Sequence, residues 1–150
     1  MVLAGAVLAV LATQGPSSTG SAATPCAPQP CAAPSHFQAV FAHMAVRGSL
    51  VSMTVTFHNR GDAGPLSAND YNHTSPADFA LVGADHVSRP EVFPAGCPNW
   101  GELRIKYGTS AGPERLCFRA PPGRLSADKI VWSPDLGLLF NSVTIPIGGP

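Results

Sequence analysis

Five histidines are the side chains of this sequence best suited to metal binding and to acid–base chemistry near neutral pH. His43 and His58 flank a stretch with Met44 and Met53, and an exported His/Met set suits copper. The alternation along Leu50–Asn59 places His58 on the solvent face of a strand but Met53 on the buried face, which weakens the set. His43 and His58 are thus candidate metal ligands, and the alternative is that the histidines are scattered surface residues.

A second group of candidate ligands carries oxygen atoms, which calcium prefers. Their spacing lacks the Asp-x-Asp-x-Asp-Gly order of a calcium loop, and Asn and Asp are also frequent turn residues. Both calcium binding and turn formation stay open, and we expect the segment Asp62–Thr74 to have a binding role. The side chains are Asp62, Asn69, Asp70, Asn72 and Asp78.

Aromatic residues next to loops form a third group. Tyr71, Trp100 and Tyr107 flank predicted loops, and amphipathic aromatic rings are favoured in binding sites. The alternative is that Trp100 and Tyr107 cover the ends of the core. We predict a binding site that contains Asp62, Asn69, Asp70, Tyr71 and Trp100.

A hydrolase would need a nucleophile, a base and an orienting group brought together. A Gly-x-Ser-x-Gly nucleophile elbow lies on a turn from a strand to a helix. The pattern occurs once, as GTSAG at Gly108–Gly112 with Ser110 in third place, but it lies in a predicted hairpin loop at Gly108–Pro113 and no helix is expected after it. We therefore expect a protein that is not an enzyme, with no catalytic residues and no cofactor.

Four cysteines indicate an oxidising compartment, because disulfides persist outside the reducing cytosol. Four cysteines allow three connectivities. We predict the pairs Cys97–Cys117 and Cys26–Cys31, the first within the folded part and the second as a small ring before it. A loop of the first length stabilises by about 3 kcal/mol in the chain-entropy account. The spacing does not match a zinc site.

The formal net charge is zero and no basic or acidic run occurs. The sequence therefore lacks the basic footprint of a nucleic-acid binder and the polybasic segment that attracts anionic lipid.

The N-terminal region predicts export. Val2–Ala12 is an apolar run that is too short to span a bilayer but long enough for the core of a signal peptide. We assign residues 1–23 to a signal peptide, residues 24–35 to a Pro/Ala-rich flexible stalk and residues 36–148 to one domain. We expect a secreted or extracellular protein with no stable membrane span after processing.

The domain shows short apolar segments separated by turn signals, which is typical of an all-β fold. We expect seven or eight strands in an antiparallel β-sandwich. If Leu116 and Phe118 face the core, Cys117 points away from it, so the disulfide fixes a loop to a strand outside the core. The expected strands are Phe37–Met44, Leu50–Asn59, Phe79–Val82, Val87–Val92, Leu103–Tyr107, Arg115–Arg119, Ile130–Trp132 and Val143–Ile147.

Three segments carry a family resemblance: VTFHNRG at Val55–Gly61, SPADFALVGAD at Ser75–Asp85 and LCFRAP at Leu116–Pro121. In this order they resemble the secreted immunoglobulin-like antigens of mycobacteria and uncharacterised lipoprotein domains of other Gram-positive bacteria. The chain departs from them in the Asp62–Thr74 insertion, the extra cysteine pair and the missing lipobox. The resemblance implies an exported immunoglobulin-like sandwich with no established activity.

Together these features predict an exported, non-catalytic immunoglobulin-like module that binds a protein, cell-envelope or host component through its loops. The alternative is an extracellular protein that binds copper or calcium.

Overall fold

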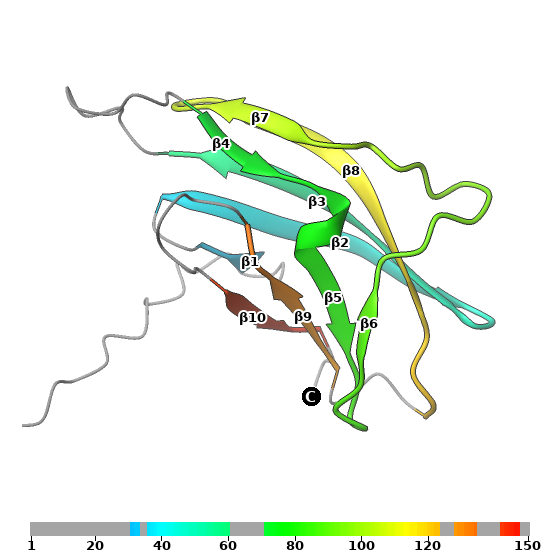
Figure 1. Ribbon diagram of the computed structural model, residues 1–150. Helices are drawn as coiled ribbons and strands as arrows, with labels where there is room; N and C mark the ends of the chain where they lie inside the picture. Colours follow the sequence, from blue (N-terminus) through cyan, green and yellow to red (C-terminus); the bar gives the residue numbers. More distant parts are fainter. Residues whose placement is uncertain (1–30, 34–35, 61–70, 124–127, 135–141, 148–150) are drawn as a thin grey trace, which may run out of the picture.

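A computed structural model describes residues 31–33, 36–60, 71–123, 128–134 and 142–147, and these residues form antiparallel β-sheets (Figure 1). A single 3-10 turn, Pro76–Asp78, is the helical element of the described residues. The strands are β1 (Cys31–Ala32), β2 (Phe37–Arg47), β3 (Leu50–Asn59), β4 (Tyr71–Thr74), β5 (Phe79–Val82), β6 (Ser88–Pro90), β7 (Leu103–Lys106), β8 (Ser110–Arg119), β9 (Lys129–Trp132) and β10 (Val143–Pro146).

Two four-stranded sheets form the sandwich. The first has the strand order β1-β2-β3-β8 and the second β10-β9-β5-β6, with every described pairing antiparallel. A two-stranded ribbon, β4-β7, lies beside β3 and β8 (Figure 1). The fold is therefore an antiparallel β-sandwich with one additional ribbon.

The core lies between the two large sheets and is rich in aromatic rings. Strand β3 alternates fully between buried and partly exposed residues, so that Val51, Met53, Val55 and Phe57 enter the core. Phe57 lies near the centre, with its ring centroid 5.8 Å from that of Trp132 and 6.1 Å from that of Phe79. The period-two pattern of the sequence thus decides which face of β3 is buried.

The all-β prediction is confirmed, and Leu50–Asn59 and Phe79–Val82 are strands with the expected bounds. Two strands were not expected. Residues 31–32 form β1 within the range 24–35 assigned to the stalk, and residues 71–74 form β4 within the assigned insertion.

The prediction of a hairpin loop at Gly108–Pro113 is wrong from Ser110 onward, because β8 begins at Ser110. Gly112 has a φ of 102°, and a Cβ there would lie 2.8 Å from the carbonyl oxygen of Val55. Close approach of two backbones explains the glycine better than a turn does. The register of β3 against β8 shifts between Val55 and Phe57 at the same place.

Candidate binding surface

The predicted disulfide Cys97–Cys117 is present. Cys117 is fully buried, yet it is not part of the core cluster that includes its neighbours Leu116 and Phe118. Its backbone carbonyl accepts a hydrogen bond from the amide of Val92 at 2.9 Å. The disulfide therefore fixes the segment after β6 onto β8, as expected, although Cys117 itself is buried. The other predicted pair includes Cys26, which lies outside the described residues.

Glu91 carries a buried carboxyl group beside this disulfide. One oxygen, Oε1, lies 3.4 Å from the amide nitrogen of Cys117, and the other, Oε2, is buried without a hydrogen-bond partner within the described residues. Burial raises the pKa of Glu91 to about 8, against the opposing effect of the Cys117 amide. No sequence pattern indicates this group, because its burial depends on the bridge between Glu91 and Phe118.

The two candidate metal ligands His43 and His58 do not come together. His43 has a φ of 53° and lies in the bulge of β2 that faces Met53. Met53 precedes His58 by five residues on β3, which corresponds to roughly 17 Å of strand. Within the described part of the chain, no group of three or more His, Cys, Asp or Glu side chains is placed to hold a metal ion.

The oxygen-bearing candidates have separate roles where they are described. The Asp78 carboxylate accepts a hydrogen bond from the Ser75 amide at 2.7 Å, so it caps the 3-10 turn. The Asn72 side chain donates to Asn59 Oδ1 at 3.2 Å. The turn interpretation therefore accounts for Asp78, whereas Asn72 lies within strand β4 and links it to the end of β3. Asp62, Asn69 and Asp70 lie outside the described residues.

Tyr71 lies on the outer face of the β4-β7 ribbon. The guanidinium carbon of Arg104 is 5.0 Å from the centre of its ring, a cation–π arrangement, and the tyrosine side chain is exposed. The register pairs Tyr71 with Lys106 and His73 with Arg104, so these four residues share one face. His73 Nδ1 also lies 2.5 Å from Glu102 Oε1. We refer to Tyr71, His73, Glu102, Arg104 and Lys106 as the ribbon face.

Asn59 fixes the ribbon to the end of β3. Its side chain is buried, donates to the Ile105 carbonyl at 2.9 Å and accepts from Asn72. Its backbone amide donates to the carbonyl of Thr109, and its carbonyl accepts from the amide of Gly108. The sequence predicts Asn59 only as the last residue of the strand Leu50–Asn59. Its hydrogen bonds to residues far along the chain are not indicated by any local pattern around Asn59.

Trp100, the other aromatic residue of the predicted site, packs against the core instead. Its ring centroid lies 6.0 Å from that of Phe57 and 6.4 Å from that of Phe79. The ring is partly exposed, and its Nε1 is buried without a partner in the described residues. The alternative interpretation, that Trp100 covers the core, is the one that these contacts favour.

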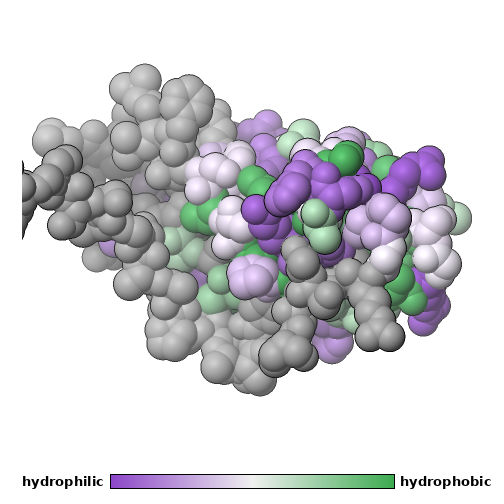
Figure 2. Space-filling model, turned by 90° about the horizontal axis from the view of Figure 1, so that it is seen from below, coloured by the Kyte–Doolittle hydropathy of each residue, from purple (hydrophilic) through white to green (hydrophobic). Residues whose placement is uncertain are grey.

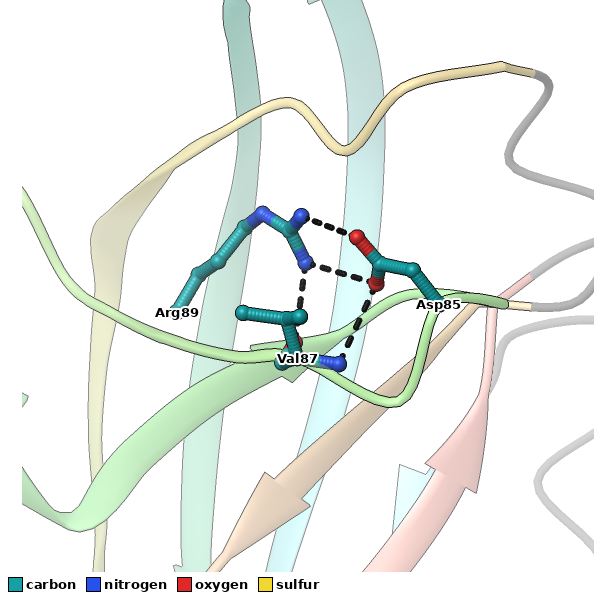
Figure 3. Close-up of polar contacts among 3 residues, drawn as sticks. All are labelled: Asp85, Val87 and Arg89. Carbon is teal, nitrogen blue, oxygen red and sulfur yellow. Dashed lines mark hydrogen bonds and ion pairs between the residues drawn. The ribbon is translucent and has the colours of Figure 1, made fainter.

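A second polar cluster lies at the turn between β5 and β6 (Figure 3). Arg89 donates to both oxygens of Asp85, from Nη2 at 2.5 Å and from Nη1 at 3.1 Å, and also to the carbonyl of Val87. The hydrogen bond from Arg89 is the largest of the effects that lower the pKa of Asp85 to about 2. A Cβ at Gly83 would lie 2.7 Å from Pro121 Cβ and 2.9 Å from Asp85 Oδ1, so close packing against Pro121 favours glycine there.

Asp128 lies close to this ion pair and is almost completely buried. Neither carboxylate oxygen has a partner at hydrogen-bond distance among the described residues. Burial raises the pKa of Asp128, while the amide of Ala84 and the charge of Arg89 act in the opposite direction. Asp85 and Arg89 satisfy one another, so this ion pair stabilises the turn between β5 and β6.

Seen from below, the described residues show hydrophilic and hydrophobic side chains side by side (Figure 2). No helix of the described residues is long and apolar enough to cross a membrane.

Five large hydrophobic side chains of the described residues are exposed. One of them, Tyr71, also lies against the guanidinium group of Arg104. The five side chains are Met44, Val46, Tyr71, Val87 and Phe93.

Comparison with known proteins supports the fold. No protein-family model and no curated protein matches the chain. Among solved structures, the yjhA protein from Bacillus subtilis is similar, with a TM-score of 0.50 and 13% identity over 69% of this chain and 77% of the other. At this identity the similarity concerns the arrangement of strands alone.

Proposed function

We propose that this chain is an exported, non-catalytic immunoglobulin-like module that binds a protein, cell-envelope or host component through the ribbon face and the adjoining segment before β4. The observation that carries the proposal is the exposed ring of Tyr71 beneath the guanidinium of Arg104. An amphipathic aromatic side chain held by a neighbour loses little conformational entropy when a partner covers it.

Several features of the ribbon support this role. Its inner residues Thr74 and Ile105 are buried, so the outer residues are free for contact while the backbone is fixed. Trp132 Nε1 donates to Thr74 Oγ1 at 3.1 Å, and Asn59 holds the other end. A binding site on strands fixed in this way is more rigid than one on loops.

Capture from cell-envelope and host extracts tests the binding role. The immobilised full chain should retain a component, identified by mass spectrometry, that then binds in direct titration. Tyr71→Ala and Arg104→Ala should each weaken binding at least about tenfold, the scale of a central interface residue. Arg119→Ala, which changes an exposed arginine on β8, is the matched control. Equal binding by all three variants would contradict the proposed surface.

Export has its own test, which is sequencing of the N-terminus of protein collected from culture medium. The mature chain should begin after Ala12 or after Ala23, where small residues precede a signal-peptidase site. Protein retained in the cell with residues 1–23 intact would argue against export and leave the binding test unaffected.

A further inference from the structure

One polar pair that is not part of the ribbon face lies on the outer face of the first sheet. His58 Nδ1 lies 2.7 Å from Ser110 Oγ, and the two residues oppose each other in the ladder between β3 and β8. When the ring is neutral with its hydrogen on Nε2, the serine hydroxyl donates to Nδ1. Hydrogen bonding between a serine and an adjacent base is the arrangement that activates a nucleophile.

We propose that Ser110 is a nucleophilic serine, with His58 as its general base, that accepts an acyl group from activated carboxylic esters. This is a covalent modification site beyond the proposed binding function, and it requires no turnover. Ser110 Oγ forms a bond to the acyl carbon and the bond to the leaving alkoxide or phenolate breaks. The hydroxyl proton passes to His58 Nδ1 and then to solvent or the leaving group.

Three observations support the assignment. Ser110 is exposed at the start of β8, so an ester can reach it. Burial lowers the pKa of His58, and the charge of Arg60 lowers it further, which keeps the imidazole neutral and able to accept a proton near pH 7. The pair lies on the hydrogen-bonded strands β3 and β8. The neighbouring residues Phe57 and Ala111 oppose each other in the same register.

The groups around His58 do not compete for its proton. On β2 its partner in the ladder is Gln38, which does not ionise, and on β8 it is Ser110. Arg60, which follows β3, is the charged group that acts on the ring. A positive charge near the site also favours the oxyanion that forms during attack on the ester.

A purely structural role is the competing explanation, since polar pairs across strands also stabilise sheets. The two roles differ in chemical reactivity. A structural pair would leave Ser110 no more reactive than any exposed serine, whereas a serine with a general base reacts faster, by about 10²–10⁴ in enzymes.

The experiment uses the full chain and p-nitrophenyl acetate, with acetylation located by peptide mass mapping. Ser110 should be acetylated at least about tenfold faster than Ser88, an exposed serine on β6 in the same molecule. The rate at Ser110 should rise with pH below the ordinary histidine range and level off above it. His58→Gln should reduce that rate to the level of Ser88, and Ser110→Ala should remove the labelled peptide.

Equal rates at Ser110 and Ser88 would overturn the proposal, as would an unchanged rate at Ser110 in His58→Gln. Acetylation of His58 alone would also overturn it. The comparison of two serines within the unchanged protein does not depend on how well any variant folds.

Discussion

The carboxyl group of Glu91 makes the stability of the protein depend on pH. In the unfolded chain its pKa is near the ordinary value of 4.5, whereas burial raises the pKa in the folded protein to about 8. Below pH 4.5 the Glu91 carboxyl group is protonated in both the folded and the unfolded state, so its burial does not lower the free energy of unfolding. As pH rises towards the higher value, only the unfolded state gains from ionisation, so the free energy of unfolding falls. Because the Glu91 side chain is partly exposed, solvent screening keeps the slope below the full linkage value of about 1.4 kcal/mol per pH unit.

Glu91→Gln should remove this dependence, because the amide stays neutral and keeps an oxygen for the Cys117 amide. We expect the variant to gain stability relative to the natural protein at pH 9 and to match it more closely at pH 5, as measured by urea unfolding at both values. Glu102→Gln, at an exposed glutamate, should not remove the dependence. A parallel pH profile for the natural protein and Glu91→Gln would mean that Glu91 is solvated.

At the scale of elements, the disulfide Cys97–Cys117 holds the segment after β6 against the edge of β8. The bonded cysteines are 20 residues apart, and closing a loop of that length stabilises by about 3 kcal/mol. The double variant Cys97→Ala, Cys117→Ala should lose about this amount in urea unfolding. The natural protein under reducing conditions should behave in the same way. A loss below about 1 kcal/mol would show that contacts such as Val92 to Cys117 hold the segment alone.

How far each element could be predicted follows from its length and its partners. The ten residues of β3 repeat the period-two pattern often enough to define both the strand and its buried face. The four residues Tyr71–Thr74 and the two residues Cys31–Ala32 are too short to show a period, and only pairing with β7 and β2 makes them strands. At the start of β8 the sequence predicts a turn, because glycine and proline are usually turn residues.

Pairing between distant strands also limits how much of the candidate sites the sequence can predict. The Cys97–Cys117 pair was predictable, because a pairing has few alternatives when there are four cysteines. The contacts of Tyr71 with Arg104 and of His58 with Ser110 depend on register between strands more than 30 residues apart, which composition and local spacing do not contain. The separation of the two candidate metal ligands has a related reason. His43 and His58 lie on neighbouring strands, but the register places them far apart.

At the scale of the whole molecule, the two sheets are held together by one aromatic cluster. Phe57, on β3 of the first sheet, contacts Phe79 and Trp132 of the second sheet, and also Trp100. Its side chain is fully buried. Because the described sandwich has a small core, a cavity at this position affects the packing of both sheets at once.

Phe57→Ala should therefore destabilise the protein by about 3–5 kcal/mol, the range observed when a buried phenylalanine is truncated. That is a large part of the stability of a domain of this size. The measurement is urea unfolding followed by tryptophan fluorescence, which is sensitive here because Trp100 and Trp132 both contact Phe57. Thr56→Ala, on the outer face of the same strand, is the matched control and should cost less than about 1 kcal/mol. Similar losses for the two variants would contradict a core centred on Phe57, because only one of the two side chains lies between the sheets.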